Sequence, residues 1–177
     1  ITSATVGATD NSSGWWTAFS DYFVINPGMS LNLQLVNHTS GGGNWNNWCA
    51  CVSTDADRGG DGYAEYFVVR SDLYGWGDAY NAANWTSGGG YDDVGSDDWA
   101  KFRADMEGAD VNVRIERSGN KVTYTSNAVA TDGTGYNESL WAECGGGTQA
   151  VRAFLIVDGS HFILKPAQCF TYVPVYK

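Results

Sequence analysis

The stretch ADVNVRIERSGNKVTYTS, residues 109–126, decides the fold class. In it Val111, Val113 and Ile115 alternate with polar residues, so that every second side chain is apolar. A period of two is typical of a β-strand that buries one face. The SGNK sequence then predicts a turn, and the alternation resumes at Val122 and Tyr124. The stretch therefore predicts a β-hairpin with one buried face.

Similar patterns recur along the chain. Residues 31–37, LNLQLVN, alternate in the same way, and residues 150–165, AVRAFLIVDGSHFILK, indicate a buried strand, an Asp-Gly turn and a partner strand. Further strands are predicted at residues 3–9, 15–25, 47–54, 62–70, 136–143 and 170–176. Many short strands with Gly-rich turns are typical of two packed sheets. We expect an all-β, jelly-roll-like antiparallel β-sandwich that forms a single domain over residues 1–177.

One segment departs from this pattern and predicts a short helix. In SDDWAKFRADMEG, residues 96–108, Ser96 is a typical N-cap and Gly108 a typical C-cap. Trp99, Phe102 and Met106 would share one helical face. We therefore expect the helix to lie across the sandwich, with Trp99 as a core residue rather than a ligand contact.

The charge of the chain restricts its partners. Asp and Glu number 20 against 10 Lys and Arg, which gives a formal net charge of −10. Such a surface repels phosphate backbones and anionic lipid headgroups. No stretch approaches the roughly 20 apolar residues of a membrane-spanning helix. We expect neither a nucleic-acid nor a membrane partner, and instead a neutral, polar ligand.

The cysteines suggest an oxidising compartment. Cys49 and Cys51 form a C-x-C pair whose spacing differs from the usual zinc ligands. Both point to the same face of one strand, so they should not bond each other. We expect each to form a disulfide with Cys144 or Cys169, in either order. No signal peptide precedes Ile1, which together with the disulfides predicts a mature secreted protein or an excised module.

Two segments combine aromatic and polar side chains in a way that suits carbohydrate. Residues 40–52, SGGGNWNNWCACV, and the long loop predicted over residues 73–95, LYGWGDAYNAANWTSGGGYDDVG, both lack apolar periodicity. A sugar ring is bound by an aromatic ring beneath its C–H face and by amides or carboxylates beside its hydroxyls. The alternative is that these aromatic residues only fill the core. The candidate carbohydrate-binding residues are Trp45, Asn46, Asn47, Trp76, Tyr80, Trp85 and Tyr91.

Another aromatic pair, Trp15 and Trp16, lies within the strand predicted over residues 15–25. Neighbouring residues of a strand point to opposite faces. We therefore expect at most one of these two rings to reach any given surface.

An enzyme is the alternative function. Glu65 lies in the strand sequence GYAEYFVVRSD, residues 62–72, which resembles the nucleophile strand of family 11 xylanases. Glycoside hydrolysis needs a second carboxylate at about 5–5.5 Å or 6.5–9.5 Å. None of the other glutamates occurs in a comparable strand flanked by aromatic residues: Glu107, Glu116, Glu138 and Glu143. Pairing of Arg70 with Glu65 or Asp72 explains the same stretch structurally. The alternative is thus a small β-sandwich glycoside hydrolase or polysaccharide lyase that uses Glu65.

No cofactor is predicted. The acidic loop TDADRGGDG, residues 54–62, could hold a structural calcium ion, although its spacing does not fit an EF-hand and such loops are usually solvated turns. The two histidines, His38 and His161, accompany no nucleophile-elbow motif.

Most of residues 25–165 resembles a known class of domain. The similarity lies in the stretches NPGMSLNLQLVNHTSGGGNWNNW, AEYFVVRSDLYGWG, GADVNVRIERSGNKVTYTS and FLIVDGSHFILK. They resemble β-sandwich carbohydrate-binding modules of bacterial plant-cell-wall hydrolases, most closely families 65 and 79. The resemblance implies non-catalytic binding of β-1,4-glucan, mixed-linkage glucan and xyloglucan by Trp45, Trp76 and Trp85, with hydrogen bonds from Asn46 or Asn47.

The resemblance also implies how such a module is used. It would be an extracellular monomer tethered to the catalytic domain of a larger glycoside hydrolase, with a plant cell-wall polysaccharide as its partner. A cell-surface adhesin or lectin for host glycans would use the same aromatic chemistry.

Overall fold

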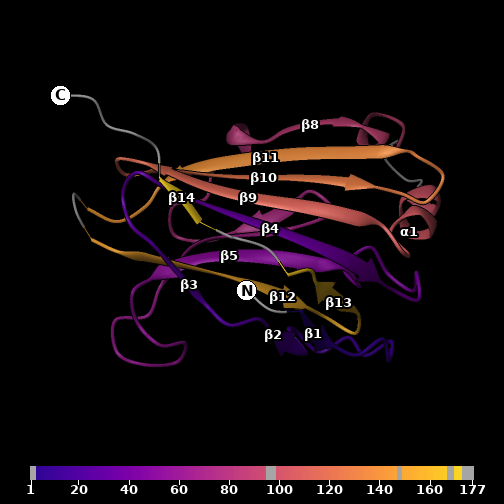
Figure 1. The fold of residues 1–177 in the computed structure, drawn as a ribbon, viewed down its shortest axis with the longest axis horizontal. Coiled ribbons are helices and arrows are strands. Elements are labelled where there is room, and N and C mark those ends of the chain that lie inside the picture. The colour runs from indigo at the N-terminus through magenta and orange to yellow at the C-terminus, as the bar shows by residue number, and fades with distance from the viewer. Residues whose placement is uncertain (1–2, 95–98, 147–148, 167–169, 173–177) are drawn as a thin grey trace.

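The computed structural model describes residues 3–94, 99–146, 149–166 and 170–172. They form two antiparallel β-sheets packed face to face, with a short helix at one end of the sandwich (Figure 1). The predicted all-β antiparallel sandwich with one short α-helix is confirmed.

The larger sheet has eight strands and contains the hairpin that the alternating sequence predicts. Lys121 pairs with Ser118 across a tight turn in which Gly119 has a φ of +60°. In order across the sheet, the strands are β1 (Ala4–Gly7), β13 (His161–Leu164), β4 (Met29–His38), β9 (Asp110–Ser118), β10 (Lys121–Val129), β11 (Gly135–Glu143) and β8 (Thr86–Gly89), with β14 (Phe170–Tyr172) also paired to β4.

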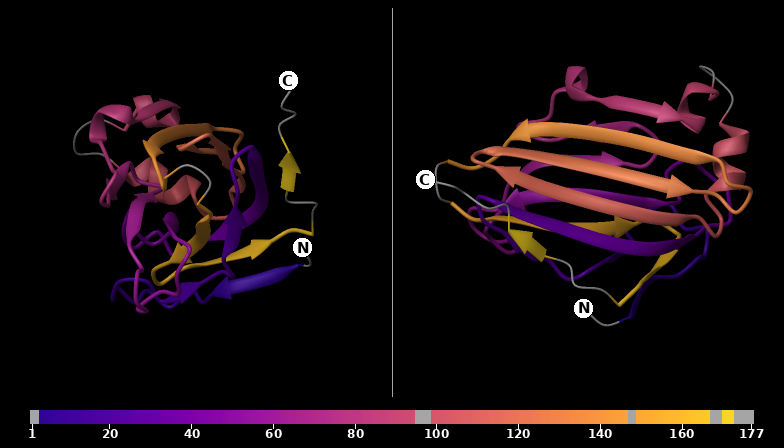
Figure 2. Two further views of the ribbon diagram at one scale, coloured as in Figure 1. Left: turned by 90° about the vertical axis from the view of Figure 1, so that its left-hand side faces the viewer. Right: turned by 45° about the horizontal axis from the view of Figure 1, so that its top comes forward.

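The second sheet has six strands and carries the candidate site on its outer face. Figure 2 shows the two layers from the side, with the chain passing repeatedly from one to the other. The strand order is β2 (Ala18–Phe19), β12 (Val151–Val157), β5 (Trp48–Thr54), β6 (Glu65–Arg70) and β7 (Tyr74–Trp76), with β3 (Phe23–Ile25) paired to β12.

The core lies between the two inner faces. Trp48 is fully buried there, and its indole N–H donates to the hydroxyl of Tyr124, 3.1 Å away. The Tyr124 and Ser126 hydroxyls in turn contact the carboxyl of Glu138, which is only 2% exposed. A buried polar chain of this kind is tolerated because most of its members have hydrogen-bond partners. One Glu138 oxygen, Oε2, has no partner among the described residues.

Residues 73–94, the described part of the predicted long loop, contain regular secondary structure. The segment forms β7 at the edge of the six-stranded sheet, a 3₁₀ turn η1 (Ala82–Asn84), β8 at the edge of the eight-stranded sheet and a second turn η2 (Gly90–Asp92). It therefore crosses from one sheet to the other. Strands of three or four residues are too short to give a recognisable alternation, which explains why the sequence did not reveal them.

The helix α1 (Ala100–Asp105) is shorter than predicted. Phe102 and Met106 are fully buried, whereas Trp99 is half-buried and packs edge-on against Phe102 at 5.1 Å between ring centroids. Trp99, which was expected in the core, therefore lies at its margin. Gly108 has a φ of +73°, as a residue after a helix often has. The predicted N-cap Ser96 lies outside the described residues. No helix in the described part of the chain has the length and apolar character needed to cross a bilayer.

The prediction of two disulfides is wrong. Cys49, Cys51 and Cys144 are buried free thiols. Cys49 and Cys51 share one face of β5, as expected, but that face points away from the inter-sheet core, whereas Cys144 packs within the core. The six-stranded sheet thus separates Cys144 from the other two. Cys169 lies outside the described residues.

These thiols give a direct chemical test of the structure. Burial raises the pKa of Cys49 and Cys51, and it raises the pKa of Cys144 to about 12. Since the thiolate is the nucleophile, alkylation of the folded protein should be slow. We expect iodoacetamide to label all three residues in guanidinium chloride without prior reduction, and to label few in the native state. Peptide mass spectrometry measures both. Labelling that requires a reductant would contradict the structure.

Candidate functional site: an aromatic groove on the outer face

The outer face of the six-stranded sheet carries a second apolar cluster. Its floor consists of side chains that point away from the core, namely Cys49, Cys51, Val68, Phe154 and Ile156. Trp16, Phe19 and Trp76 pack over this floor and remain partly accessible. An antiparallel sheet commonly has one solvated and polar face. An apolar outer face covered with aromatic rings is therefore a candidate binding surface.

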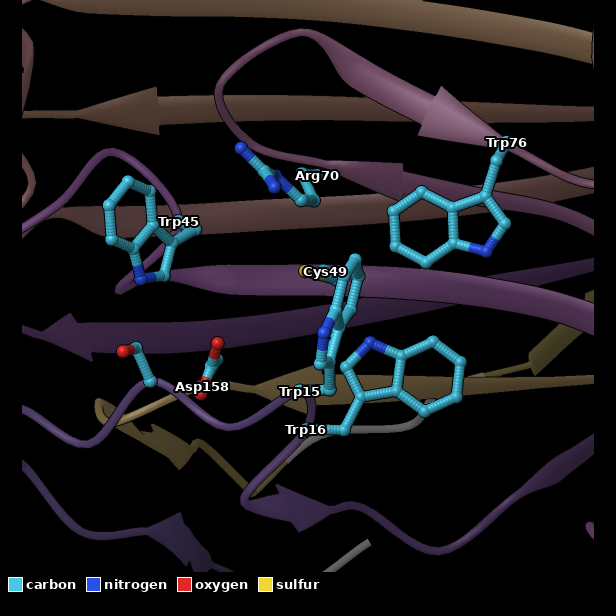
Figure 3. A pocket seen from close by; sticks show the side chains of 8 residues that line it. Trp15, Trp16, Trp45, Cys49, Arg70, Trp76 and Asp158 are labelled. Carbon is cyan, nitrogen blue, oxygen red and sulfur yellow. The ribbon is translucent and has the colours of Figure 1, made fainter.

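Four tryptophans surround a groove on this face. The groove is lined by Trp15, Trp16, Trp45 and Trp76, together with Ser13, Cys49, Arg70 and Asp158 (Figure 3). Trp45 and Trp76 lie at opposite ends in this view, and Trp15 stands between them. The Trp15 side chain is 73% exposed and that of Trp45 is 42% exposed. Large indole surfaces are thus left in water, where a flat apolar ligand surface could cover them.

The backbone at Trp15 and Trp16 explains how both rings reach the groove. They have φ values of +52° and +55°, in the left-handed region, and lie before β2 rather than in a strand. The prediction that they face opposite ways is wrong for this reason. The left-handed conformation costs roughly 1–2 kcal/mol for a residue with a Cβ atom. Such strain is found most often at functional sites.

Neighbouring contacts hold the rings in a continuous row. Trp16 and Trp76 stack with centroids 6.2 Å apart and planes 18° from parallel, and Trp15 meets Trp76 edge-on at 5.9 Å. Tyr74 adjoins Trp76 at 5.8 Å on one side, and Phe19 adjoins Trp16 at 5.8 Å on the other. The row therefore crosses the sheet from its edge strand β7 to β2. Rings fixed in this way lose little entropy when a ligand covers them.

Two charged groups lie on opposite walls of the groove in Figure 3. Arg70 donates through Nε and Nη2 to the two oxygens of Asp72, at 2.9 and 2.5 Å, so the predicted Arg70–Asp72 pair is present. This bidentate pair fixes the guanidinium and leaves other N–H groups free to donate. Asp158 accepts from the Gly14 N–H at 3.2 Å and presents an acceptor on the facing wall. A hydroxylated ligand would thus meet a donor and an acceptor.

The Gly-rich turn places Trp45 at the groove. A Cβ atom at Gly43 would lie 2.6 Å from the Trp45 ring, so the ring can pack over the turn only because residue 43 is glycine. Asn46 donates to the carbonyl of Asp158 at 2.7 Å. Asn47 accepts from the Asn37 side chain at 2.9 Å and donates to the Asn44 carbonyl at 3.0 Å.

Asn46 and Asn47 are 4% and 1% exposed. Their side chains bond within the fold and support the turn that carries Trp45.

The other predicted residues divide between the two faces of the sheet. Trp76 points into the groove, whereas Tyr80 and Trp85 are partly buried residues packed against the inter-sheet core, with the Trp85 N–H donating to the Tyr80 hydroxyl at 2.7 Å. Tyr91 is 5% exposed and donates to the Ser71 carbonyl. The structure thus brings together Trp45 and Trp76 but not Tyr80, Trp85 and Tyr91.

A second hollow continues along the same face beyond Phe19 and Phe154. The guanidinium of Arg58 lies 3.6 Å from the centre of the Phe19 ring. On the other side Arg152 pairs with Asp55 and Asp57, at 2.9 and 2.8 Å. These two aspartates belong to the loop considered for calcium. The described residues contain no cluster of three or more His, Cys, Asp and Glu side chains suited to a metal ion.

Glu65, the residue of the enzyme alternative, lies near this second hollow. The hydroxyl of Tyr63, which lines the hollow, donates to its Oε2 atom at 2.7 Å. The Cys51 sulfur is 4.0 Å from the same oxygen. The Glu65 carboxylate is thus contacted by Tyr63, which precedes β6, and by Cys51 of the neighbouring strand β5.

Comparisons with protein-family models, with curated proteins and with solved structures found no match to this chain. The resemblance to carbohydrate-binding modules therefore stays a prediction, and the geometry of the groove carries the functional argument.

Proposed function

We propose that the protein is a non-catalytic carbohydrate-binding module that holds a glucan chain in the groove on the outer face of its six-stranded sheet. The observation that carries this proposal is the convergence of Trp15, Trp16, Trp45 and Trp76 around one groove. Indole faces pack against the C–H faces of sugar rings, and the row of rings suits a chain rather than a single sugar. Arg70 and Asp158 supply a donor and an acceptor for hydroxyl groups.

The charge of the protein favours a neutral polysaccharide. With a net charge of −10, the surface repels anionic polymers such as pectin more than it repels a glucan. The β-1,4-glucans, mixed-linkage glucans and xyloglucan are the glycans of the modules that the sequence resembles. We propose them as ligands, in a secreted protein whose module is joined to a hydrolase. The groove does not favour the enzyme alternative, because Glu65 does not line it, whereas glycoside hydrolysis needs two carboxylates that flank the bound sugar chain.

Affinity electrophoresis and product assays together test this function. We expect retarded migration in native gels that contain xyloglucan or barley β-glucan, with less retardation by xylan and none by pectin. Incubation with the same polysaccharides should release neither reducing ends nor unsaturated uronates. Product release would replace the proposal with the Glu65 enzyme. Unretarded migration on every glucan would reject a glucan-binding module.

A further inference from the structure

The second hollow lies along the same strands as the groove. On β5 and β12 the outer-face side chains come in register pairs, namely Cys49 with Ile156, Cys51 with Phe154, and Ser53 with Arg152. Cys49 lines the groove, whereas Ser53 lines the second hollow. At roughly 3.3 Å per residue these two positions of β5 lie about 13 Å apart, so the two depressions are neighbours along one floor.

Aromatic rings continue from the groove into the second hollow. Trp16, which lines the groove, meets Phe19 edge-on at 5.8 Å between ring centroids. Phe19 packs against Phe154 at 6.1 Å, and both of these rings line the second hollow. Beyond them lies Tyr22, which is 52% exposed and has the guanidinium of Arg152 over its ring at 3.9 Å. The row of rings that crosses the groove therefore extends to Tyr22.

Polar side chains surround the rings of the second hollow. The guanidinium of Arg58 lies over Phe19 and has neither a hydrogen bond nor an ion pair to any described residue, so its N–H groups can donate to a ligand. Two arginines and two aspartates line the hollow, Arg58, Arg152, Asp21 and Asp57. Their formal charges cancel, which favours a neutral ligand over an ionic one. The hollow has a volume of about 270 Å³, compared with about 200 Å³ for the groove.

We propose that the second hollow extends the binding site and holds further sugar units of the same glucan chain that the groove binds. This proposal rests on the glucan-binding function of the groove. The chain would run along the strands from Trp45, at one end of the groove, to Tyr22. Tyr22 offers a ring to the C–H face of a sugar, and Arg58 donates to its hydroxyl groups. Affinity should therefore depend on chain length, because a short oligosaccharide fills only the groove.

Calorimetric titration with cellotriose and cellohexaose tests the extension, since a β-1,4-linked backbone is common to the proposed glucans. We expect one cellohexaose per protein chain, bound at least about 10-fold more tightly than cellotriose. The double variant Tyr22→Ala/Arg58→Ala should lower the cellohexaose affinity roughly 10-fold and leave the cellotriose affinity unchanged. Both residues are exposed, so the variant should melt close to the wild type. Trp76→Ala, in contrast, should weaken the binding of both sugars.

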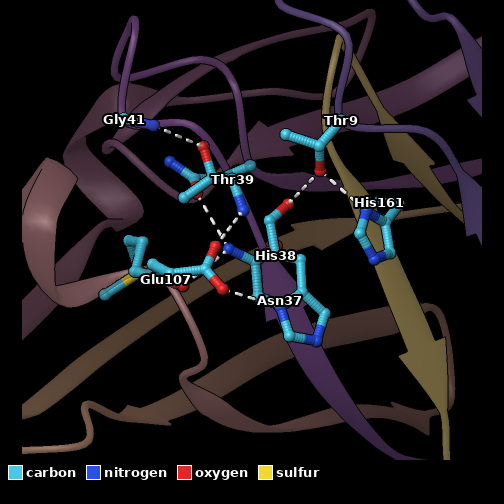
Figure 4. Close-up of polar contacts among 9 residues, drawn as sticks. Thr9, Asn37, His38, Thr39, Gly41, Glu107 and His161 are labelled. Carbon is cyan, nitrogen blue, oxygen red and sulfur yellow. Dashed lines mark hydrogen bonds and ion pairs between the residues drawn. The ribbon is translucent and has the colours of Figure 1, made fainter.

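His161→Ala is the matched control on the other sheet. The His161 ring stacks on that of His38 with centroids 4.8 Å apart, and its Nδ1 atom lies 2.7 Å from the Thr9 hydroxyl (Figure 4). The variant thus removes a packed and partly exposed ring, as Tyr22→Ala does. Since His161 lines neither the groove nor the second hollow, its loss should leave the affinity for both sugars unchanged.

The outcomes separate the extension from the function of the groove. Equal wild-type affinity for the two sugars, normal cellohexaose binding by the double variant, or an equal loss for both sugars in it would overturn the extension while the groove stands. Two cellohexaose molecules bound per protein would do the same, because they would show two separate sites. No binding of either sugar to the wild type would reject the groove as a site for a β-1,4-glucan backbone, and the extension with it.

Discussion

Trp76→Ala is expected to lower the affinity for a soluble glucan by about 30-fold or more. Truncation of an aromatic anchor commonly costs about 2 kcal/mol or more in binding free energy. Trp76 lies at one end of the groove but anchors the row of rings, since it stacks on Trp16 and contacts Trp15 and Tyr74. Calorimetric titration with xyloglucan oligosaccharides measures the change, and circular dichroism shows whether the variant remains folded.

Trp141→Ala is the matched control. Trp141 is a half-buried residue of β11, and the Nζ atom of Lys121 lies 4.6 Å from the centre of its ring. It belongs to the eight-stranded sheet, so its removal should leave glucan affinity unchanged. Normal binding by Trp76→Ala, or an equal loss in both variants, would show that the groove is not the binding site.

Glu138→Gln is expected to stabilise the protein by roughly 3–5 kcal/mol at pH 9 and to change little at pH 5. Burial raises the pKa of Glu138 from 4.5 to about 8, against the opposing effect of its hydrogen bonds with Ser126 and Tyr124. Between pH 4.5 and 8 the folded chain therefore binds more protons than the unfolded chain. Each pH unit in this window then costs about 1.4 kcal/mol of stability as the pH rises.

Urea denaturation of the wild type and of the Glu138→Gln variant from pH 5 to pH 9 measures how the two unfolding free energies differ. The glutamine side chain of the variant would keep an acceptor for Ser126 and Tyr124 but could not ionise. The variant therefore lacks the penalty that the wild type acquires above pH 4.5. The difference in unfolding free energy should grow from pH 5 to pH 8 and then level off. A difference that is constant with pH, or that favours the wild type at pH 9, would show that Glu138 does not titrate in this range.

The strands were predictable because their apolar alternation is local. Val111, Val113 and Ile115 are buried and their polar neighbours Asn112 and Arg114 are exposed, as a period of two requires. The short helix was predictable as an element for the same reason, because Phe102 and Met106 recur at helical spacing and both are buried.

The composition of the groove was only partly predictable. Trp45 and Trp76 lie in segments whose polar, Gly-rich character distinguishes them from core strands. Trp15 and Trp16 were missed as a pair, since their left-handed backbone follows from the tertiary structure rather than from propensity. The sequence feature that could have indicated this part of the groove is the pair of adjacent tryptophans after Ser-Ser-Gly.

The roles of other residues depend on contacts that are distant in sequence. Asn46 forms a hydrogen bond with Asp158, and Asn47 forms one with Asn37. These partners allow both polar side chains to be buried, and no local sequence pattern identifies them. The spacing of Cys49 and Cys51 likewise predicts that they share one face of a strand. Which face points to the core, where Cys144 lies, depends on how the two sheets pack.

Assignment of the indole N–H resonances during a glucan titration tests the groove most directly. The chain has eight tryptophans, and each gives one such signal. We predict that added xyloglucan oligosaccharide shifts the signals of the four groove residues, Trp15, Trp16, Trp45 and Trp76, and leaves those of Trp48, Trp85 and Trp141 in place. Saturable shifts confined to Trp85 or Trp141, or no shift at a ligand concentration where binding is seen by calorimetry, would contradict the account.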